Sequence, residues 1–442
     1  MTRNRLALVL TAALTLCATP AANAQDELSL AIERDYPSLE VLYHHLHANP
    51  ELSFQEKNTA ARLVQELRDA GLTVTPNVGG HGFVGVLENG EGPTVMIRTD
   101  LDALPVEERT GLPYASTARA TEQTGQEVSV MHACGHDVHM TCLVGVARRM
   151  VEMRDQWSGT LVMIGQPAEE RGAGAKAMLE DGLFTRFPRP DYNLAFHVSS
   201  NHPAGSVAFV PGWAMANVDS VDITIHGVGG HGSAPHTTKD PIVLAASIIM
   251  DLQTIVAREI DPLEPAVVTV GSIHAGTKHN IISERADLQI TVRSYSDETR
   301  ERLLAAIERI AIGNARAFGI PEDKLPDVVV KDEFTPSLYN DPELTARLKK
   351  VIGDRLGADR VLPGTPVMGG EDFARYGRQD PRIPSLMFRV GAIEQEMYDQ
   401  AMAEGRTLPS LHTPYFAPDA KPTITAGVEA MTVAALELLG GD

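Results

Sequence analysis

The first part of the chain shows two helical patterns of apolar residues. In the segment PSLEVLYHHLHANPELSFQE, the residues Leu39, Leu42 and Leu46 recur at the spacing of one helix face. A second helical pattern covers residues 58–70, and Gly71 directly after it is a typical helix stop. Both segments are therefore predicted to contain amphipathic helices.

From residue 81 onward, strand-like apolar runs alternate with helical patterns. The predicted elements are a strand, turn and strand at 81–100, a helix at 136–154, a strand at 160–165, a helix at 174–183 and a strand at 192–198. Strands that alternate with helices of this length are typical of an α/β domain with a largely parallel central sheet.

The order of elements changes near residue 217. The pattern there predicts strands at 218–226, 266–274, 286–295 and 327–334, with helices at 242–258 and 297–318. This is the β-α-β-β-α-β order of a ferredoxin-like unit, which can fold around its own core. A helix at 342–356, a strand at 385–392 and a helix at 423–439 follow. We therefore predict that residues 217–335 are inserted between two parts of one α/β domain, 25–216 and 336–442.

The N-terminal residues 1–24 have the features of a secretory signal peptide. Arg3 and Arg5 precede an apolar run at 6–16, and Ala22 and Ala24 supply the small residues of a cleavage site. Cleavage after Ala24 predicts an exported protein, either periplasmic or secreted.

Export makes the cysteines informative, because oxidising compartments favour disulfides. Cys17 would permit a lipoprotein, but Leu16 before it is bulky where a small residue is expected. Cys134 and Cys142 remain after cleavage, and on one helix they would lie about 12 Å apart along its axis. That distance is too long for a disulfide. Cys134 is therefore expected to be a thiol, which a bound metal would protect.

The charge balance argues against two classes of partner. The 442 residues include 58 acidic and 38 basic side chains, for a formal net charge of -20, and no Lys/Arg-rich run is present. Binding to nucleic acid or to an anionic membrane surface is therefore disfavoured. We also find no later segment of about 18 uncharged apolar residues, so we expect no membrane span.

Two segments near predicted strand and helix ends carry potential metal chemistry. Asp100 and Asp102 follow a strand in IRTDLDALP, where they could orient histidine ligands or simply form a turn. Cys134 and His136 in HACGHD are separated by one glycine and lead into a helix. Thiolate and imidazole suit zinc and similar metals, and a helix N-terminus lowers the pKa of a thiol.

Three further segments supply carboxylates and histidines. Glu169 and Glu170 directly follow an apolar strand, so one could bind metal while the other accepts a proton from a metal-bound water. His197 closes another apolar strand, and His412 precedes a Thr-Pro turn. Each of these is ambiguous alone, as a solvated turn or an ordinary histidine. Together with Cys134 and His136, they have the composition of a site for two metal ions and a general base.

Several motifs resemble one family in the same order over nearly the whole mature chain. They are HANPELSFQE, IRTDLDALPVEE, HACGHDVHMT, GQPAEE, FHV, GGHGSAPH, GGEDFA and LHTPYF. They resemble the amidohydrolase branch of the aminoacylase/carboxypeptidase-type dinuclear metallopeptidases, which includes hippurate, N-acyl-amino-acid and auxin-conjugate hydrolases. The chain departs from other branches at Arg98, where those branches carry a histidine ligand.

The resemblance implies roles for individual residues. It implies a metal-ligand set, with Cys134 as the bridge, of Cys134, His136, Glu170, His197 and His412. It implies that Glu169 is the general base and that His231, on the insert, polarises the scissile carbonyl, often in the partner subunit's site. Asn280 and Arg293 match positions that contact substrate. The insert matches a lid and dimerisation domain, and the cofactors would be two divalent ions, zinc or manganese.

Other histidines and carboxylates receive a structural interpretation. The HHLH segment at 44–47 lies on an amphipathic helix, and His132 is not expected to be a ligand. His139, three residues after His136, is expected behind the ligands or in a structural role. Glu371 and Asp372 are expected to cap a helix or to lie behind the metals.

The sequence thus predicts an exported amidohydrolase that cleaves N-acyl amino acids. A dipeptidase or carboxypeptidase acting on short peptides is the alternative within enzymes, because the sequence does not show the acyl pocket. A ligand-binding relative without catalysis is the alternative outside enzymes, and the presence of Glu169 beside all five ligands argues against it. A homodimer formed through the insert is expected.

Overall fold

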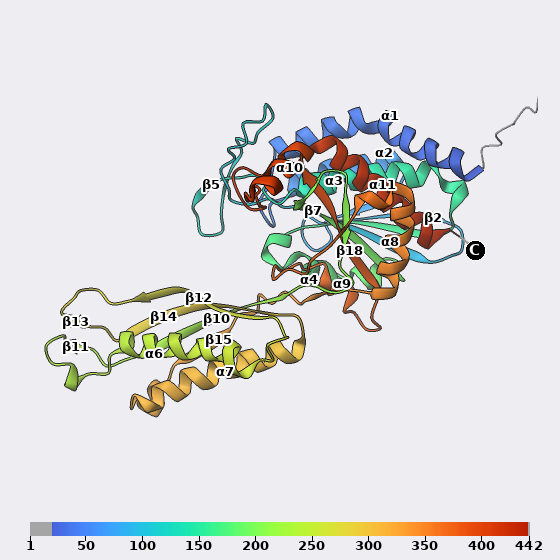
Figure 1. Cartoon of the computed structure of the whole chain (residues 1–442). Coiled ribbons are helices and arrows are strands. Elements are labelled where there is room, and N and C mark those ends of the chain that lie inside the picture. Colours follow the sequence, from blue (N-terminus) through green and yellow to red (C-terminus); the bar gives the residue numbers. More distant parts are fainter. Residues whose placement is uncertain (1–19, 441–442) are drawn as a thin grey trace, which may run out of the picture.

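The computed structural model describes residues 20–440, and its centre is an eight-stranded, mostly parallel sheet (Figure 1). Strands β6, β3, β7 and β18 run parallel in the middle, and antiparallel pairs join β1, β2 and β8 to them. In sheet order the strands are β1 (Thr73–Pro76), β2 (Phe83–Asn89), β6 (Gly159–Gln166), β3 (Thr94–Asp100), β7 (Tyr192–Pro203), β18 (Ser385–Ile393), β8 (Val207–Phe209) and β17 (Val361–Pro363).

Helices cover both faces of this sheet, because its central strands are apolar on both sides. In β3, the side chains of Val95 and Ile97 pack into one core, while that of Met96 packs into the core on the opposite face. The first face is covered by α1 (Pro20–Ala48), α2 (Lys57–Ala70), α3 (His136–Glu152), α8 (Pro342–Leu356) and α11 (Ala420–Leu439). The second face is covered by α4 (Gly174–Glu180), α5 (Leu183–Arg186) and α9 (Ala374–Gly377).

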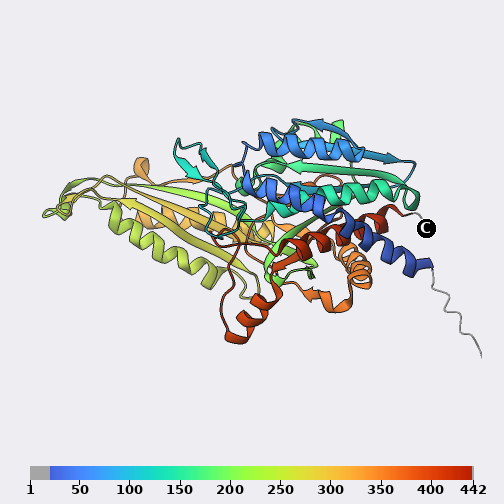
Figure 2. The same cartoon turned by 90° about the horizontal axis from the view of Figure 1, so that it is seen from above.

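The insert forms a second unit that projects from the central sheet (Figures 1 and 2). Its four-stranded antiparallel sheet has the order β12-β14-β10-β15, and apolar residues from these strands and two helices form a separate core. In chain order the elements are β10 (Asn217–His226), α6 (Pro241–Thr254), β12 (Ala266–Ala275), β14 (Arg285–Ser294), α7 (Asp297–Ala317) and β15 (Asp327–Val330).

The structure also contains three small strand pairs and one more α-helix. They are β4 (Arg119–Thr121) with β5 (Glu127–Ser129), β9 (Gly212–Met215) with β16 (Leu338–Asn340), β11 (Gly230–His231) with β13 (Ile281–Ile282), and α10 (Gln395–Glu404). The sequence analysis predicted none of these elements. The strands have only two to four residues, which carry little periodicity, and only Ala401 of the ten residues of α10 is buried, so this helix lacks an apolar face.

Local sequence signals predicted the end of α2 correctly but not the start of α1. Gly71 ends α2 in the left-handed conformation at φ 105°, as predicted. The first helix is longer than predicted, because α1 starts at Pro20 and contains Pro37 in its interior. Burial of Leu28 and Ile32 on the same face as Leu39 explains why the helix continues through the proline. The predicted signal peptide lies mostly outside the described residues.

Two described helices are long and apolar enough to cross a membrane by length and composition alone. They are Pro241–Glu259 and Ala420–Leu439, with 33% and 67% of their most apolar windows buried. The second packs between α1, α3 and α8, and the first contributes Leu244 and Ile248 to the core of the insert. Core helices pass the same test, so their composition gives little reason to infer a membrane span.

Candidate functional site

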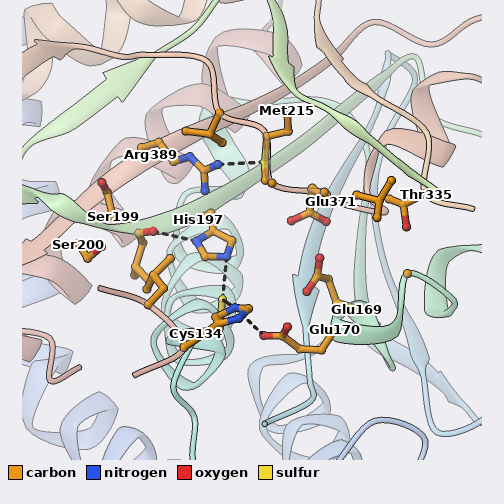
Figure 3. Close-up of a pocket in the computed structure, with 18 of the residues that line it drawn as sticks. Cys134, Glu169, Glu170, His197, Ser199, Ser200, Met215, Thr335, Glu371 and Arg389 are labelled. Carbon is orange, nitrogen blue, oxygen red and sulfur yellow. Dashed lines mark hydrogen bonds and ion pairs between the residues drawn. The ribbon is translucent and has the colours of Figure 1, made fainter. Parts of the chain in front are cut away.

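The predicted site residues converge at the carboxyl ends of the central parallel strands, where ligands bind in open α/β sheets. Glu169 and Glu170 follow β6 in a short 3₁₀ turn, and His197 lies on β7. His136 is the first residue of α3, and His412 lies in the loop before α11. Figure 3 shows how several of these side chains face one another across a cavity of about 860 Å³.

The Cys134 sulfur lies at the centre of this group. It is 3.4 Å from Nε2 of His197 and 3.2 Å from Nε2 of His412. Oε1 of Glu170 lies 3.4 Å from Nε2 of His412 and 3.9 Å from Nε2 of His136. The structure therefore brings together all five residues that were predicted to bind metal.

The hydrogen bonds of the histidines fit this group to a metal. Nδ1 of His136 is 2.8 Å from the carbonyl oxygen of Asp102, and Nδ1 of His197 is 2.8 Å from the carbonyl oxygen of Val198. A proton on each Nδ1 leaves Nε2 with a free lone pair that faces the cysteine and glutamate. Nε2 of His136 and Oε1 of Glu170 are buried and have no hydrogen-bond partner within the described residues. Such unsatisfied buried atoms are costly unless an ion satisfies them.

The backbone is unusual at three positions of the site. Gly135 adopts φ 78° between Cys134 and His136, and a Cβ there would lie 2.5 Å from Val198 Cγ2. Ala168, just before Glu169, has φ 48°, and His412 itself has φ 64°. Left-handed backbone is uncommon for residues other than glycine and is frequent at functional sites, where surrounding contacts hold it.

Asp102 fixes the turn that carries the two glutamates. Its carboxylate accepts hydrogen bonds from the backbone N–H groups of Glu169 and Glu170, each at 3.1 Å, and from the hydroxyl of Ser53 at 2.6 Å. Glu56 accepts the N–H of Ala168 at 2.8 Å. The family-like segment NPELSFQE therefore acts on the site by holding this turn.

His139 lies behind the ligands. Its Nδ1 is 2.7 Å from Oδ1 of Asp100, and its Nε2 accepts the backbone N–H of Val198 at 2.9 Å. Both ring nitrogens are therefore used, which leaves no lone pair for a metal. His132 is also buried, but it belongs to none of the groups of described residues that could hold an ion, and burial lowers its pKa to about 4.

Arg98 is buried on β3 at the base of the site, and Glu169 is among the carboxylates that raise its pKa. Its guanidinium forms ion pairs with Asp100 at 2.6 Å, Glu371 at 2.8 Å and Asp372 at 3.3 Å. These three carboxylates balance the charge of a buried arginine at a position where other branches of the family carry a histidine ligand. Glu371 lines the cavity and faces Glu169, and its carboxylate accepts the N–H of Phe373 at 2.9 Å. Asp372 accepts the N–H of Ala175 in the first turn of α4 at 2.9 Å, in line with the helix-capping interpretation.

The carboxyl of Glu169 faces the cavity, and its nearest basic group among the described residues is Nε2 of His136, at 3.9 Å. Burial raises the pKa of Glu169 well above its ordinary value, and the neighbouring carboxylate of Glu371 raises it further. Burial and the nearby Glu170 and Glu169 carboxylates also raise the pKa of the Cys134 thiol. Without a metal, Cys134 is therefore protonated at neutral pH.

The predicted residues on the insert fall into two groups. Arg293 lines the cavity and donates a hydrogen bond from Nη1 to the carbonyl oxygen of Met368 at 2.8 Å. His231 and Asn280 do not line the cavity, because they lie at the β11–β13 end of the insert (Figure 1). The carbonyl oxygen of Asn280 accepts the N–H of Gly232. Within one chain, the structure does not bring these two residues to the metal-ligand group.

Sequence reasoning missed Arg389, which lines the cavity from β18. The available signal was a charged residue inside the otherwise apolar strand SLMFRVGA. The same signal, a charge inside VMIRTD, would have identified Arg98 as a buried member of the site.

The mostly parallel sheet and this set of thiol, imidazole and carboxylate groups are those of a metal-dependent hydrolase. Residues 96–409 match the model of peptidase family M20/M25/M40. The chain therefore belongs to this family, and its similarity to amidohydrolases within the family supports the amidohydrolase branch.

Relatives of known name cover most of the chain. Hippurate hydrolase of Campylobacter jejuni is 39% identical over 342 residues, which are 76% of this chain and 84% of that protein. Thermostable carboxypeptidase 1 of Saccharolobus solfataricus is 38% identical over 340 residues, 76% of this chain and 82% of that protein. The crystal structure of the Bacillus subtilis YXEP protein, a dinuclear metal-binding peptidase of the M20 family, matches with a TM-score of 0.74 and 28% identity. That match covers 92% of this chain and 99% of the other.

Proposed function

We propose that this protein is an exported, metal-dependent amidohydrolase that cleaves the amide bond of N-acyl amino acids such as N-benzoylglycine. One observation carries the proposal: five potential ligands from distant segments meet around Cys134, and Glu169 stands beside them facing the cavity. Relatives named hippurate hydrolase and N-acetyl-L-cysteine deacetylase support this substrate class.

The arrangement favours two divalent ions that share Cys134. One group of possible ligands is Cys134, His136 and His197, and another is Cys134, Glu170 and His412. These two groups have the cysteine in common, as the bridging role implied by the family resemblance requires. Thiolate and imidazole ligands favour zinc, and manganese remains the alternative from the family resemblance. When bound, the ions would supply Lewis acidity that activates water and polarises a carbonyl.

Glu169 is proposed as the general base. Its carboxylate accepts a proton from the attacking water and returns it to the amine that leaves. Burial and the Glu371 carboxylate raise the pKa of Glu169, which makes its ionised carboxylate a stronger proton acceptor. Arg98 keeps the Glu371 carboxylate paired at 2.8 Å, so that the charge below Glu169 is partly balanced.

The insert is proposed as a lid and dimerisation domain of residues 217–335. Strand β12 is an edge of its sheet, and α6 exposes the apolar side chains of Ile242, Val243 and Met250. An exposed edge and an apolar helix face support pairing of two copies around a two-fold axis. His231 and Asn280 would then act from the tip of one insert on the site of the partner, while Arg293 contacts substrate in its own chain.

Two further parts of the proposal rest on the sequence. Residues 1–24 are proposed as a signal peptide cleaved after Ala24, which gives a periplasmic or secreted enzyme. A dipeptidase or carboxypeptidase is the second candidate function, favoured by the relative named thermostable carboxypeptidase 1.

Hydrolysis of defined substrates tests these functions directly. Purified protein is assayed with N-benzoylglycine, N-acetylmethionine and a dipeptide, with and without chelator. We expect chelator-sensitive turnover that is faster on the N-acyl amino acids than on the dipeptide. Glu169→Gln is expected to keep its metal and to lose about 10²- to 10⁴-fold in kcat. Faster turnover of the dipeptide would favour the second function, and unchanged kcat in Glu169→Gln would remove Glu169 as the base.

A further inference from the structure

Arg389 stands beside one of the proposed metal ligands. In the parallel pairing of β18 with β7, Arg389 is the direct partner of His197. Paired residues on neighbouring strands lie about 5 Å apart and point to the same face of the sheet. Figure 3 shows the guanidinium of Arg389 on one side of the His197 ring and Cys134 on the other. The positive charge is therefore next to the reacting centre.

This guanidinium has no carboxylate partner among the residues that the structure describes. Within residues 20–440, its only hydrogen-bond contact runs from Nη2 to the thioether sulfur of Met215, at 2.9 Å. Thioether sulfur is a weak acceptor, so the charge is poorly satisfied. Arg98 is buried at the same site, and its guanidinium forms ion pairs with three carboxylates. The contrast indicates that Arg389 is held ready for an anion that the chain itself does not supply.

The wall next to Arg389 is polar. Ser199 and Ser200, which follow His197 on β7, are buried to 7% and 6% exposure and line the same cavity. The Ser199 hydroxyl accepts the N–H of Asn201 and lies 2.8 Å from Nδ1 of His202, so Ser200 is the freer of the two hydroxyls. Hydroxyl groups and a guanidinium are the donors that recognise a carboxylate, and arginine does so with two parallel hydrogen bonds.

The other two arginines of the cavity differ from Arg389. Arg293 already donates to the carbonyl oxygen of Met368, and Arg171 is exposed. Neither residue is paired with a proposed metal ligand on a neighbouring strand of the central sheet. Arg171 therefore serves as a control, since its removal takes away the same charge without removing a cation from beside His197.

We propose that Arg389 is a specificity-determining residue that binds a carboxylate of the substrate beside the metal-ligand group. The inference rests on the proposed function and adds a chemical requirement to it: a good substrate places a carboxylate within reach of β18. Two carboxylates could satisfy the requirement. One is the α-carboxylate of the amino acid, and the other is a carboxylate at the end of the acyl group.

The test measures binding of three probes by calorimetry to metal-loaded, full-length Glu169→Gln protein, with Arg389 intact or changed to Met or Lys. The probes are N-benzoylglycine, N-benzoylglycinamide, which lacks the α-carboxylate, and N-succinylglycine, which carries an acyl-side carboxylate. Arg389→Met is expected to weaken the binding of a carboxylate probe about 10- to 100-fold, the effect of losing a charged pair of hydrogen bonds. Arg389→Lys should restore part of that loss, because it returns the charge without the planar fork.

The pattern across the probes identifies the carboxylate. Weaker binding of N-benzoylglycine with unchanged binding of N-benzoylglycinamide assigns the α-carboxylate. A loss confined to N-succinylglycine assigns the acyl-side carboxylate. Three results would overturn the proposal. They are an equal loss of affinity for all three probes, a loss of affinity no larger than that caused by Arg171→Met, and no binding of any probe. Binding is measured without turnover. A wild-type protein that binds these probes but does not hydrolyse them would therefore refute the proposed function, while the contribution of Arg389 to probe affinity would still be measured.

Discussion

The sulfur of Cys134 lies 3.2 Å from Nε2 of His412, although 278 residues separate the two in sequence. The contact joins the segment before α3 to the loop before α11, across the two parts of the chain that flank the insert. A thiol and an imidazole nitrogen at this distance form a pair that a shared metal ion would stabilise.

The first prediction concerns the reactivity of Cys134. A bound metal occupies the sulfur, so chelator-treated protein should be alkylated by iodoacetamide about tenfold faster or more. Because burial raises the pKa of this thiol, the rate in the metal-free protein should keep rising above pH 9. Cys142 is an internal control, since it is fully buried and contacts the carbonyl oxygen of Ile424 instead. Equal Cys134 alkylation rates with and without metal, measured by peptide mass spectrometry, would remove it from the ligands.

The second prediction concerns Arg98. Its replacement by Met leaves the carboxylates of Asp100, Glu371 and Asp372 buried without their counter-charge. The free energy of unfolding should fall by about 3–5 kcal/mol, the cost of leaving a buried ion pair half-made. Arg309→Met removes an exposed pair with Glu259 and should cost less than about 1 kcal/mol. Similar urea midpoints for the two variants would contradict the role of Arg98 at the base of the site.

The third prediction concerns pH and His47, which lies between Asp137 and Glu108 at 2.7 and 3.0 Å. Burial lowers the pKa of His47, but hydrogen bonds to the two carboxylates outweigh it and raise the pKa to about 10. A raised pKa stabilises the fold below the unfolded value of 6.5, and this contribution is lost as pH rises to about 10.

Between these pH values the His47 contribution should fall by about 1.4 kcal/mol per pH unit. The difference in unfolding free energy between wild type and His47→Gln, measured in urea at pH 7 and pH 9, should therefore shrink. His226→Gln, at an exposed histidine that pairs with Asp327, should stay within about 0.5 kcal/mol of wild type. A wild-type advantage that grows with pH would show that His47 is neutral in the folded protein.

The fourth prediction concerns the tip of the insert. If His231 serves the partner's site, a mixture of Glu169→Gln and His231→Ala chains should regain activity on forming hybrid dimers. In each hybrid, one site combines an intact Glu169 with an intact His231 from the other chain. Random mixing should restore about a quarter of the wild-type rate. No recovery beyond the sum of the two parent variants would place the action of His231 within its own chain.

Local sequence signals predicted much of the fold, and the family resemblance supplied the metal-ligand set. The donors Cys134, His136, Glu170 and His197 lie at ends of predicted strands or helices, and parallel strands bring such ends to one edge of the sheet. The sequence order therefore implied their convergence, and Gly71 marked a helix end because its backbone requires a left-handed conformation.

Other features depended on pairing between distant segments and could not be predicted locally. The role of Arg389 follows from its register with His197 on another strand, and the role of Arg98 follows from Glu371 and Asp372. The position of His231 depends on how the insert projects from the central sheet (Figure 2). A linear pattern contains none of these distances.

The most direct test of the two-metal account, our fifth prediction, is a titration of metal-free protein with zinc or manganese. Bound metal per chain is measured by mass spectrometry, and N-benzoylglycine hydrolysis is measured on the same samples. The account predicts that metal-stripped protein is inactive and that activity reaches its plateau at two bound ions per chain. The His412→Ala variant should reach neither two bound ions per chain nor the wild-type plateau of activity. Full activity in stripped protein, with less than one ion bound per chain, would contradict it.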